Sequence, residues 1–469
     1  MKTAVFAFAF LTGIIISVGN VETIVAQQTD MKPPVAKKEP NVLKIHGYEI
    51  TDNYFWLRDR NEKKNPEVIK YLEAENAYTE SFMGRHKGFV ENLYKEMLGR
   101  IKQTDLSVPY RLGDYWYFTR VEEGKQYPVY LRGKTRDGKD AEVLLDQNEM
   151  AKGYGYFSIG AFEPSDDGNL LAFSTDTTGY RQYTLQIKDL RTGKMLPDKI
   201  ERATSIEWSN DGKYLFVVQE DPVSKRSDKL WRHTVGTADK NELVFEEKDV
   251  LFNLGVGRSR DKKMLFVSSY AKTMRESRYL PADNPTGEWK IISPRREGHE
   301  YAADFNNGEF FIVTNKNAEN FKVVKAPLND PTEKNWTDFI AHNPAVKIDD
   351  INFFKDYAVV SELENGLEYL RVMDLKTRRA AARIATPEDV YTMSLSSNPE
   401  YDTPAIRYNY ASMITPNSTY EYDFRTRKSE LLKQQEIPSG YDKSKYETRR
   451  VWATTRDGVK VPISVVMKK

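Results

Sequence analysis

The chain has 469 residues, more than one ordinary hydrophobic core serves, so a large repeat architecture or two to three domains are expected. Its 70 basic and 69 acidic residues balance, and no long basic run occurs, so nothing indicates a nucleic-acid partner. The lack of cysteine excludes disulfides, a thiol nucleophile and cysteine-ligated zinc.

Residues 1–26 have the layout of a secretory signal peptide. Lys2 supplies a positive charge, residues 4–18 are almost wholly apolar, and Ile24-Val25-Ala26 is a plausible cleavage point. An uncleaved membrane anchor is the alternative, but the apolar run is shorter than the roughly 20 residues that a span needs. We therefore expect an exported protein, periplasmic or secreted, with no stable membrane insertion after cleavage.

Residues 27–110 are predicted to form an amino-terminal leader and a helical segment. The stretch 27–40 is polar and proline-rich, as is typical of a disordered leader. Apolar residues recur at helical spacing over 66–83, with Pro66 at a favoured first position, and again over 89–101. Each pattern predicts a helix with one apolar face.

From about residue 114 the apolar period changes to two, which indicates strands. Seven short apolar strands begin 44 to 55 residues apart, at Trp116, Leu171, Leu215, Leu265, Phe310, Tyr357 and Ala405. Turn sequences such as Asn210-Asp211-Gly212 precede several of them, and a partner strand follows about ten residues later. This repeat predicts a seven-bladed β-propeller over residues 111–436, with a β-sandwich pair or a solenoid as the alternative.

Residues 437–469 fall outside this repeat. A polar, turn-rich linker over 437–445 is followed by two strand patterns, 446–455 and 459–467, on either side of the turn Arg456-Asp457-Gly458. We expect this hairpin to be the start of another domain that is cut off at Lys469.

Few residues with catalytic chemistry occur in a useful pattern. The histidines have no metal-ligand spacing: His46, His86, His233, His299 and His342. No G-x-S-x-G occurs, and Ser158, in the nearest imitation, is flanked by aromatic residues that favour a blade strand. Gly255-Val256-Gly257 is not followed by a helix pattern, so we expect a turn there rather than a phosphate-binding loop.

Adjacent carboxylates are a further possible site. The pairs are Glu122-Glu123, Glu246-Glu247 and Asp349-Asp350. Two carboxylates could serve a glycosidase on a propeller scaffold, but adjacent acids usually lie on solvated strand edges. We therefore assign no catalytic, cofactor-binding or metal-binding residue to this chain, and no cofactor.

Several motifs resemble the prolyl oligopeptidase family of serine peptidases. Residues 54–59 (YFWLRD) and 71–76 (YLEAEN) are similar to its amino-terminal signature. Within the family, oligopeptidase B is resembled by residues 98–105 (LGRIKQTD), 122–128 (EEGKQYP), 231–233 (WRH), 298–301 (GHEY), 432–434 (LKQ) and 456–464 (RDGVKVPIS). The resemblance runs from about residue 33 to the last residue.

The resemblance implies a two-part serine peptidase. In the family an α/β-hydrolase domain carries the Ser, Asp and His triad, and a seven-bladed propeller restricts its substrates to short peptides. Members similar to oligopeptidase B cleave after Arg or Lys, whose charge calls for a paired carboxylate. The expected fold is therefore dominated by β-structure: a short helical N-terminal segment that packs on the hydrolase, a seven-bladed propeller, and the first hairpin of a truncated α/β-hydrolase domain.

The family places the triad beyond the hairpin that ends this chain, so no triad residue can be assigned here. We expect the gating propeller of an oligopeptidase B-like serine endopeptidase that is inactive by itself. Its expected partners are short basic peptides and a missing or separate hydrolase domain. A free-standing propeller that serves as a binding module is the alternative, and a propeller glycosidase has no motif to support it.

Overall fold

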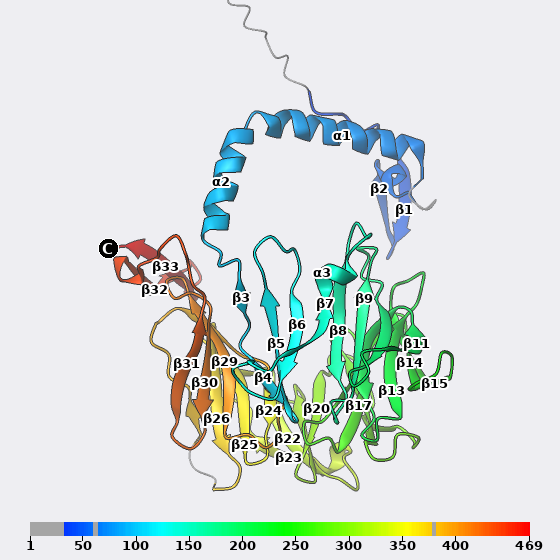
Figure 1. Cartoon of the computed structure of the whole chain (residues 1–469), viewed down its shortest axis with the longest axis vertical. Coiled ribbons are helices and arrows are strands. Elements are labelled where there is room, and N and C mark those ends of the chain that lie inside the picture. Colours follow the sequence, from blue (N-terminus) through cyan, green and yellow to red (C-terminus); the bar gives the residue numbers. More distant parts are fainter. Residues whose placement is uncertain (1–31, 60–63, 378–380) are drawn as a thin grey trace, which may run out of the picture. The chain divides into compact units, whose positions relative to one another are not determined.

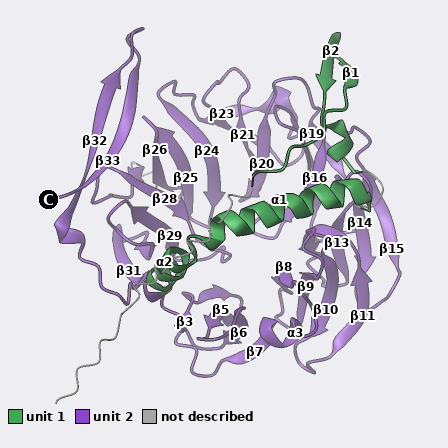
Figure 2. Ribbon diagram, turned by 90° about the horizontal axis from the view of Figure 1, so that it is seen from above, with its two compact units in different colours: residues 1–98 green, residues 99–469 purple. Residues whose placement is uncertain are grey.

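A computed structural model describes residues 32–59, 64–377 and 381–469. The chain divides into two compact units, Met1–Leu98 and Gly99–Lys469, coloured separately in Figure 2. The predicted signal peptide over residues 1–26 lies outside the described residues.

The first unit contains a hairpin and helices. Strand β1 (Asn41–Ile45) pairs with β2 (Tyr48–Asp52) across a tight turn, and the 3-10 helix η1 (Phe55–Leu57) follows. Helices α1 (Pro66–Gly84) and α2 (Lys87–Gly99) confirm the two predicted helices. The Asn65 side chain caps α1 by accepting a hydrogen bond from the Glu67 backbone N–H.

The second unit contains seven consecutive antiparallel sheets that stand as blades around a common axis (Figure 1). In blades 2 to 7 the four strands follow one another in chain order across the sheet. In blade 1, β3 and β4 pair with successive parts of β5 and share the innermost position. The predicted seven-bladed β-propeller is confirmed.

The blades have the following bounds. Blade 1 contains β3 (Asp105–Leu106), β4 (Tyr110–Leu112), β5 (Tyr115–Val121), β6 (Val129–Gly133) and β7 (Glu142–Asp146). The short helix α3 (Gln147–Met150) leads to blade 2, with β8 (Ser158–Pro164), β9 (Leu170–Asp176), β10 (Thr184–Asp189) and β11 (Met195–Ile200). Blade 3 contains β12 (Ala203–Trp208), β13 (Tyr214–Glu220), β14 (Ser227–Thr234) and β15 (Asn241–Glu246).

The second half of the ring continues the same plan. Blade 4 contains β16 (Asn253–Arg258), β17 (Met264–Tyr270), β18 (Arg275–Pro281) and β19 (Lys290–Ser293). Blade 5 contains β20 (Tyr301–Asn306), β21 (Glu309–Thr314), β22 (Lys322–Pro327), the 3-10 helix η2 (Glu333–Asn335) and β23 (Thr337–Ile340). Blade 6 contains β24 (Val346–Phe353), β25 (Tyr357–Glu364), β26 (Leu367–Asp374) and β27 (Ala382–Arg383). Blade 7 contains β28 (Tyr391–Leu395), β29 (Ala405–Ser412), β30 (Ser418–Asp423) and β31 (Lys428–Gln434).

The core lies between neighbouring blades, because each blade buries both of its faces. Blades 4 and 5, for example, share a cluster in which the rings of Phe266 and Phe310 meet edge to face, 6.3 Å apart. Apolar clusters of this kind fill six of the junctions, from blades 1 and 2 to blades 6 and 7. The repeating apolar strands therefore supply the packing that holds the ring together.

The junction of blades 7 and 1, here called the seam, is different. Within the described residues no apolar cluster and no shared strand joins the two blades. Polar contacts replace them: Arg407 donates to the Pro109 carbonyl and lies 3.4 Å from Glu421, which also pairs with Arg136 at 3.3 Å. The ring closes there through charged side chains.

A final hairpin follows the ring. The 3-10 helix η3 (Lys443–Lys445) precedes β32 (Tyr446–Thr454), which pairs with β33 (Lys460–Lys468). Gly458 has the positive φ, 85°, that its turn requires. The structure thus contains the predicted hairpin, and many of its apolar side chains are exposed, including Trp452 and Ile463.

Candidate functional site

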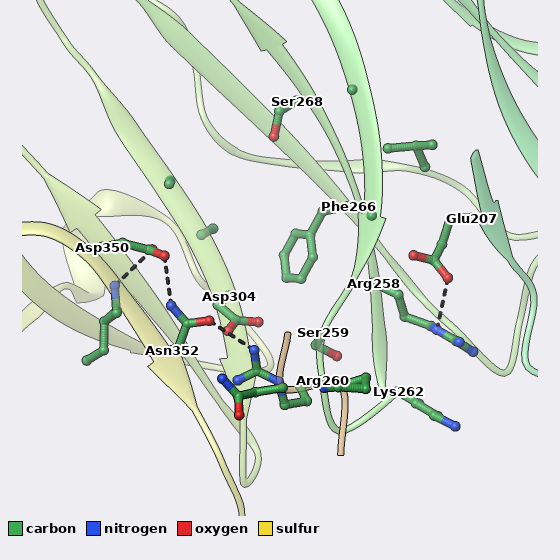
Figure 3. Close-up of a pocket in the computed structure, with 18 of the residues that line it drawn as sticks. Glu207, Arg258, Ser259, Arg260, Lys262, Phe266, Ser268, Asp304, Asp350 and Asn352 are labelled. Atoms are coloured by element: carbon green, nitrogen blue, oxygen red, sulfur yellow. Dashed lines mark hydrogen bonds and ion pairs between the residues drawn. The ribbon is translucent and has the colours of Figure 1, made fainter. Parts of the chain in front are cut away.

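A central cavity of about 760 Å³ is the candidate site. Its lining residues come from all seven blades, so it surrounds the axis of the ring. The volume falls in the range of roughly 300–1,000 Å³ that is usual for ligand sites. Charged side chains point into it, among them Glu207, Arg258 and Asp304 (Figure 3).

The acids of the cavity recur at one position of the repeat. Glu163, Glu207 and Asp304 lie on the innermost strands β8, β12 and β20. Each pairs with the second residue of the apolar run that begins the next strand: Ala172, Phe216 and Phe311. In blade 4 the same position is Gly257, opposite Phe266, and a Cβ there would meet open space. The same position of the repeat therefore places a carboxylate on the cavity wall in blades 2, 3 and 5. In blade 4 it places no side chain there, which leaves a gap at Gly257.

The surroundings of these carboxylates disfavour their charged form, so their pKa values are raised. Burial raises the pKa of Glu207 to about 7, against the attraction of Arg258 and with the help of Glu163. Burial raises the pKa of Asp304 to about 6, although Arg260 and a hydrogen bond from the Phe305 N–H oppose the rise. The pKa values of Glu163 and Asp350 are raised by burial as well. Five carboxylates and four cationic side chains line the cavity, and of the four acids with a raised pKa, Glu207 and Asp304 are half-buried whereas Glu163 and Asp350 are exposed.

Arg258, at the end of β16, ties three blades together at the cavity wall. Its guanidinium donates to both carboxylate oxygens of Asp166 in blade 2, at 2.8 and 2.9 Å, and to Asn210 in blade 3. Its Nε lies 3.3 Å from Glu207. Burial acts to raise the pKa of Asp166, but its bonds to Arg258 and Lys262 outweigh this and lower it. Asp166 therefore pairs with two cations, Arg258 and Lys262, whereas Glu207 is approached by the Nε of Arg258.

Arg260, which follows β16 in blade 4, contacts blade 6. It donates to the Phe353 carbonyl at 2.8 Å and to Asn352 Oδ1 at 2.9 Å, and its guanidinium lies 4.3 Å from the centre of the Phe354 ring. These acceptors are neutral, and burial lowers the pKa of Arg260. Arg260 therefore does not form a close ion pair with Asp304 or Asp350 among the described residues.

The histidines lie apart from this cavity. His233 is fully buried between Asp198 and Asn241, and His299 is buried against Tyr301 with one nitrogen 3.0 Å from the Thr314 hydroxyl. His46 lies in the β1–β2 turn, and His86 lies beside Phe82 after α1. His342 accepts a hydrogen bond from the Asn320 N–H. None of the five lines the cavity.

The other sequence candidates have mixed outcomes. Ser158 begins β8 and lies 3.4 Å from the Tyr183 hydroxyl, so it is in a blade strand as expected. The expected turn at Gly255-Val256-Gly257 is wrong: these residues belong to β16, where the missing side chain of Gly257 leaves room in the cavity.

The three adjacent acid pairs are dispersed in the structure. Asp350 lines the cavity, whereas Glu247 binds Arg295 at 2.5 Å and Glu122 binds Arg120 at 2.7 Å. The repeated acids Glu163, Glu207 and Asp304 were missed at the sequence level. A partial signal was available: Glu163 and Glu207 each stand eight residues before an aligned apolar strand, whereas Asp304 stands six residues before one.

Across the described residues, no group of three or more His, Cys, Asp or Glu side chains is placed to hold a metal ion. The same part of the chain contains no helix with the length and apolar character of a membrane span.

Comparison with known proteins places these features in context. The family described as "Prolyl oligopeptidase, N-terminal beta-propeller domain" matches residues 33–435. Dipeptidyl aminopeptidase BI of Pseudoxanthomonas mexicana is 42% identical over 457 residues, which cover 93% of this chain and 62% of that protein. Protease 2 of Moraxella lacunata is 33% identical over 445 residues, 93% of this chain and 63% of that protein.

Solved structures give the same picture. Oligopeptidase B from Trypanosoma brucei, in a closed form with covalently bound antipain, matches with a TM-score of 0.85 and 30% identity over 93% of this chain and 65% of that one. Oligopeptidase B from Leishmania major matches with a TM-score of 0.86 and 27% identity over the same shares. The chain therefore spans less than two thirds of the length of these relatives.

Proposed function

This chain belongs to the prolyl oligopeptidase family and contains its N-terminal β-propeller domain, and from that premise we propose that it is the substrate-gating part of an oligopeptidase B-like serine endopeptidase. The proposed enzyme cleaves short peptides after Arg or Lys. The triad is supplied by a hydrolase portion, so the chain alone does not hydrolyse peptides.

The observation that carries this proposal is the charge of the central cavity. Glu163, Glu207 and Asp304 project from equivalent positions of three blades, and burial raises the pKa of each. A peptide with a cationic side chain offsets that penalty, whereas an acidic peptide adds to it. The resemblance of the sequence motifs to oligopeptidase B, which implies cleavage after Arg or Lys, supports a basic substrate class.

A second candidate is a dipeptidyl aminopeptidase. The relative with 42% identity carries that name, and its identity to this chain exceeds that of protease 2 by 9 percentage points (42 minus 33). The two candidates differ in which end of the peptide they recognise, and both require a hydrolase portion.

The test uses two preparations: the purified chain, and the longest reading frame that contains these residues. Each is assayed with a fluorogenic Arg-Arg substrate, once with a blocked and once with a free amino end. We expect the chain alone to show no turnover. We expect the longer product to hydrolyse the blocked substrate, and a serine reagent to inhibit that activity.

Cleavage of only the substrate with the free amino end favours the dipeptidyl aminopeptidase. Serine-reagent-sensitive turnover by the chain alone contradicts the proposal, and a frame that adds no hydrolase favours a binding module.

We also propose that residues 1–26 direct export to the periplasm or the exterior. The support is their sequence layout. Fractionation of cells that express the chain, with amino-terminal sequencing of the product, tests it; an uncleaved cytoplasmic product contradicts it.

A further inference from the structure

The wall of the central cavity has a gap at Gly257, between Glu207 of blade 3 and Asp304 of blade 5. The register of the strands makes these three positions equivalent. A Cβ added at Gly257 meets no atom within 4 Å, and its backbone φ lies outside the left-handed region, so the glycine is not required by the chain conformation. The missing side chain leaves free volume between two carboxylates.

An aromatic ring forms one side of this gap. Phe266 pairs with Gly257 in the sheet and lines the cavity, where Figure 3 shows its ring between Asp304 and Glu207. Cations are attracted to the face of such a ring. Such contacts between arginine and phenylalanine already occur in this chain, for example at 4.0 to 4.3 Å: Arg295 on Phe252, Arg278 on Phe245 and Arg260 on Phe354.

The charges around the gap leave carboxylates unneutralised. Arg258 and Lys262 pair with Asp166, at 2.8 and 2.9 Å, and only the Nε of Arg258 approaches Glu207. Among the described residues, Glu163, Asp304 and Asp350 form no ion pair within 4.0 Å, and Arg260 is bound to neutral acceptors. A bound cation would therefore gain charge partners without breaking an existing close pair.

We propose that this gap, defined by Glu207, Gly257, Phe266 and Asp304, is a binding site for the cationic side chain of a peptide, a guanidinium or ammonium group. The inference rests on the proposed function, because it names the peptide feature that the gating propeller recognises. Glu207 and Asp304 accept hydrogen bonds from the cation, and the Phe266 ring lies against its apolar side.

Protonation of the two acids weakens this site. Glu207 faces Arg258, Glu163 and Asp166, and Asp304 faces Arg260, Asp261 and Asp350. With pKa values of about 7 and about 6, both carboxylates carry full charge only above neutral pH. Binding of a cationic peptide is therefore expected to be tighter at pH 8 than at pH 5.5.

The test is calorimetric titration of the purified full chain with the capped tripeptide acetyl-Ala-Arg-Ala-amide. Its neutral analogue, with citrulline in place of arginine, is the matched probe. We expect the analogue to bind at least about tenfold more weakly, which corresponds to about 1.4 kcal/mol. The variant Glu207→Gln/Asp304→Asn is expected to lose the same factor. Because burial raises the pKa of both acids, we expect the variant to keep its fold, and thermal unfolding checks this.

A second variant tests the volume without changing any charge. Gly257→Leu fills the gap and is expected to abolish binding, whereas Gly84→Leu, where an added side chain also meets open space, leaves it unchanged. Equal binding of the two peptides, or binding that survives both Gly257→Leu and the double substitution, overturns the inference. So does the absence of binding of the arginine peptide at millimolar concentration.

The outcome is separable from that of the proposed function. Cleavage after arginine by the longer gene product, with no binding at the gap, rejects the site and keeps the peptidase. Binding at the gap without any peptidase activity rejects the enzyme and keeps the site.

Discussion

At the scale of single residues, the half-buried carboxylate of Glu207 makes stability depend on pH. Its pKa of about 7 in the folded chain lies above the ordinary value of 4.5, chiefly because of burial. The folded state therefore binds this proton more tightly than the unfolded state. The stabilisation that comes from this tighter proton binding is fully present below about pH 4.5 and is lost as the pH rises through about 7.

The substitution Glu207→Gln removes this dependence. We expect the variant to be more stable than the unsubstituted chain by about 1–2 kcal/mol at pH 8 and nearly equal to it at pH 4.5. Urea unfolding at both pH values, followed by tryptophan fluorescence, measures the difference. Glu430→Gln, at an exposed position of β31, is the control and should stay within about 0.5 kcal/mol. A variant destabilised at pH 8 would show that the contact with Arg258 outweighs burial.

At the scale of elements, a buried histidine fastens blade 2 to blade 3. His233 on β14 has its Nε2 2.7 Å from the Asp198 carboxylate on β11 and its Nδ1 2.8 Å from Asn241 Oδ1 on β15. Asp198 also accepts from the Gly236 N–H at 2.8 Å. One carboxylate oxygen of Asp198 thus meets both the Nε2 of the fully buried His233 ring and the Gly236 N–H.

We expect Asp198→Ala to destabilise the chain by about 2–3 kcal/mol, because it leaves the His233 ring and the Gly236 N–H unsatisfied. Chemical unfolding at pH 7.5 measures the loss. Asp239→Ala, an exposed substitution in the neighbouring β14–β15 turn, is expected to change stability by less than about 0.5 kcal/mol. Equal effects of the two substitutions would contradict a fastening role for the buried pair.

Local patterns predicted the strands and turns but not the direction of their side chains. The apolar run at Leu215 became β13, and Gly212 before it has the positive φ, 64°, that the turn sequence required. Gly257 shows the limit: two closely spaced glycines are a turn signal in isolation, yet they belong to β16 because its partner β17 and the cavity determine its conformation. Which strand positions face the axis depends on the closure of the ring, a non-local property.

At the scale of the whole molecule, sequence motifs identified the family, and the period of the repeat predicted the number of blades. Neither could indicate that the seam differs from the other six junctions. That difference arises because residues about 300 positions apart meet there, as Pro109 and Arg407 do. It also involves Lys433, which pairs with Asp105, and Lys102, which lies 2.7 Å from Glu436.

The charged seam predicts that salt loosens the ring at one place. Raising NaCl from about 0.1 M to about 1 M shortens the Debye length from about 10 Å to about 3 Å and weakens partly exposed ion pairs, whereas apolar junctions are not weakened in this way. Hydrogen exchange followed by mass spectrometry should therefore quicken in β4, β5, β29 and β30 but not in β13 and β17. In Glu421→Gln, which lacks the carboxylate that Arg136 and Arg407 share, exchange at the seam should already be fast at low salt and respond less to added salt. Uniform acceleration in all seven blades would contradict this, because it would place the effect of salt on the whole fold rather than on the junction of blades 7 and 1.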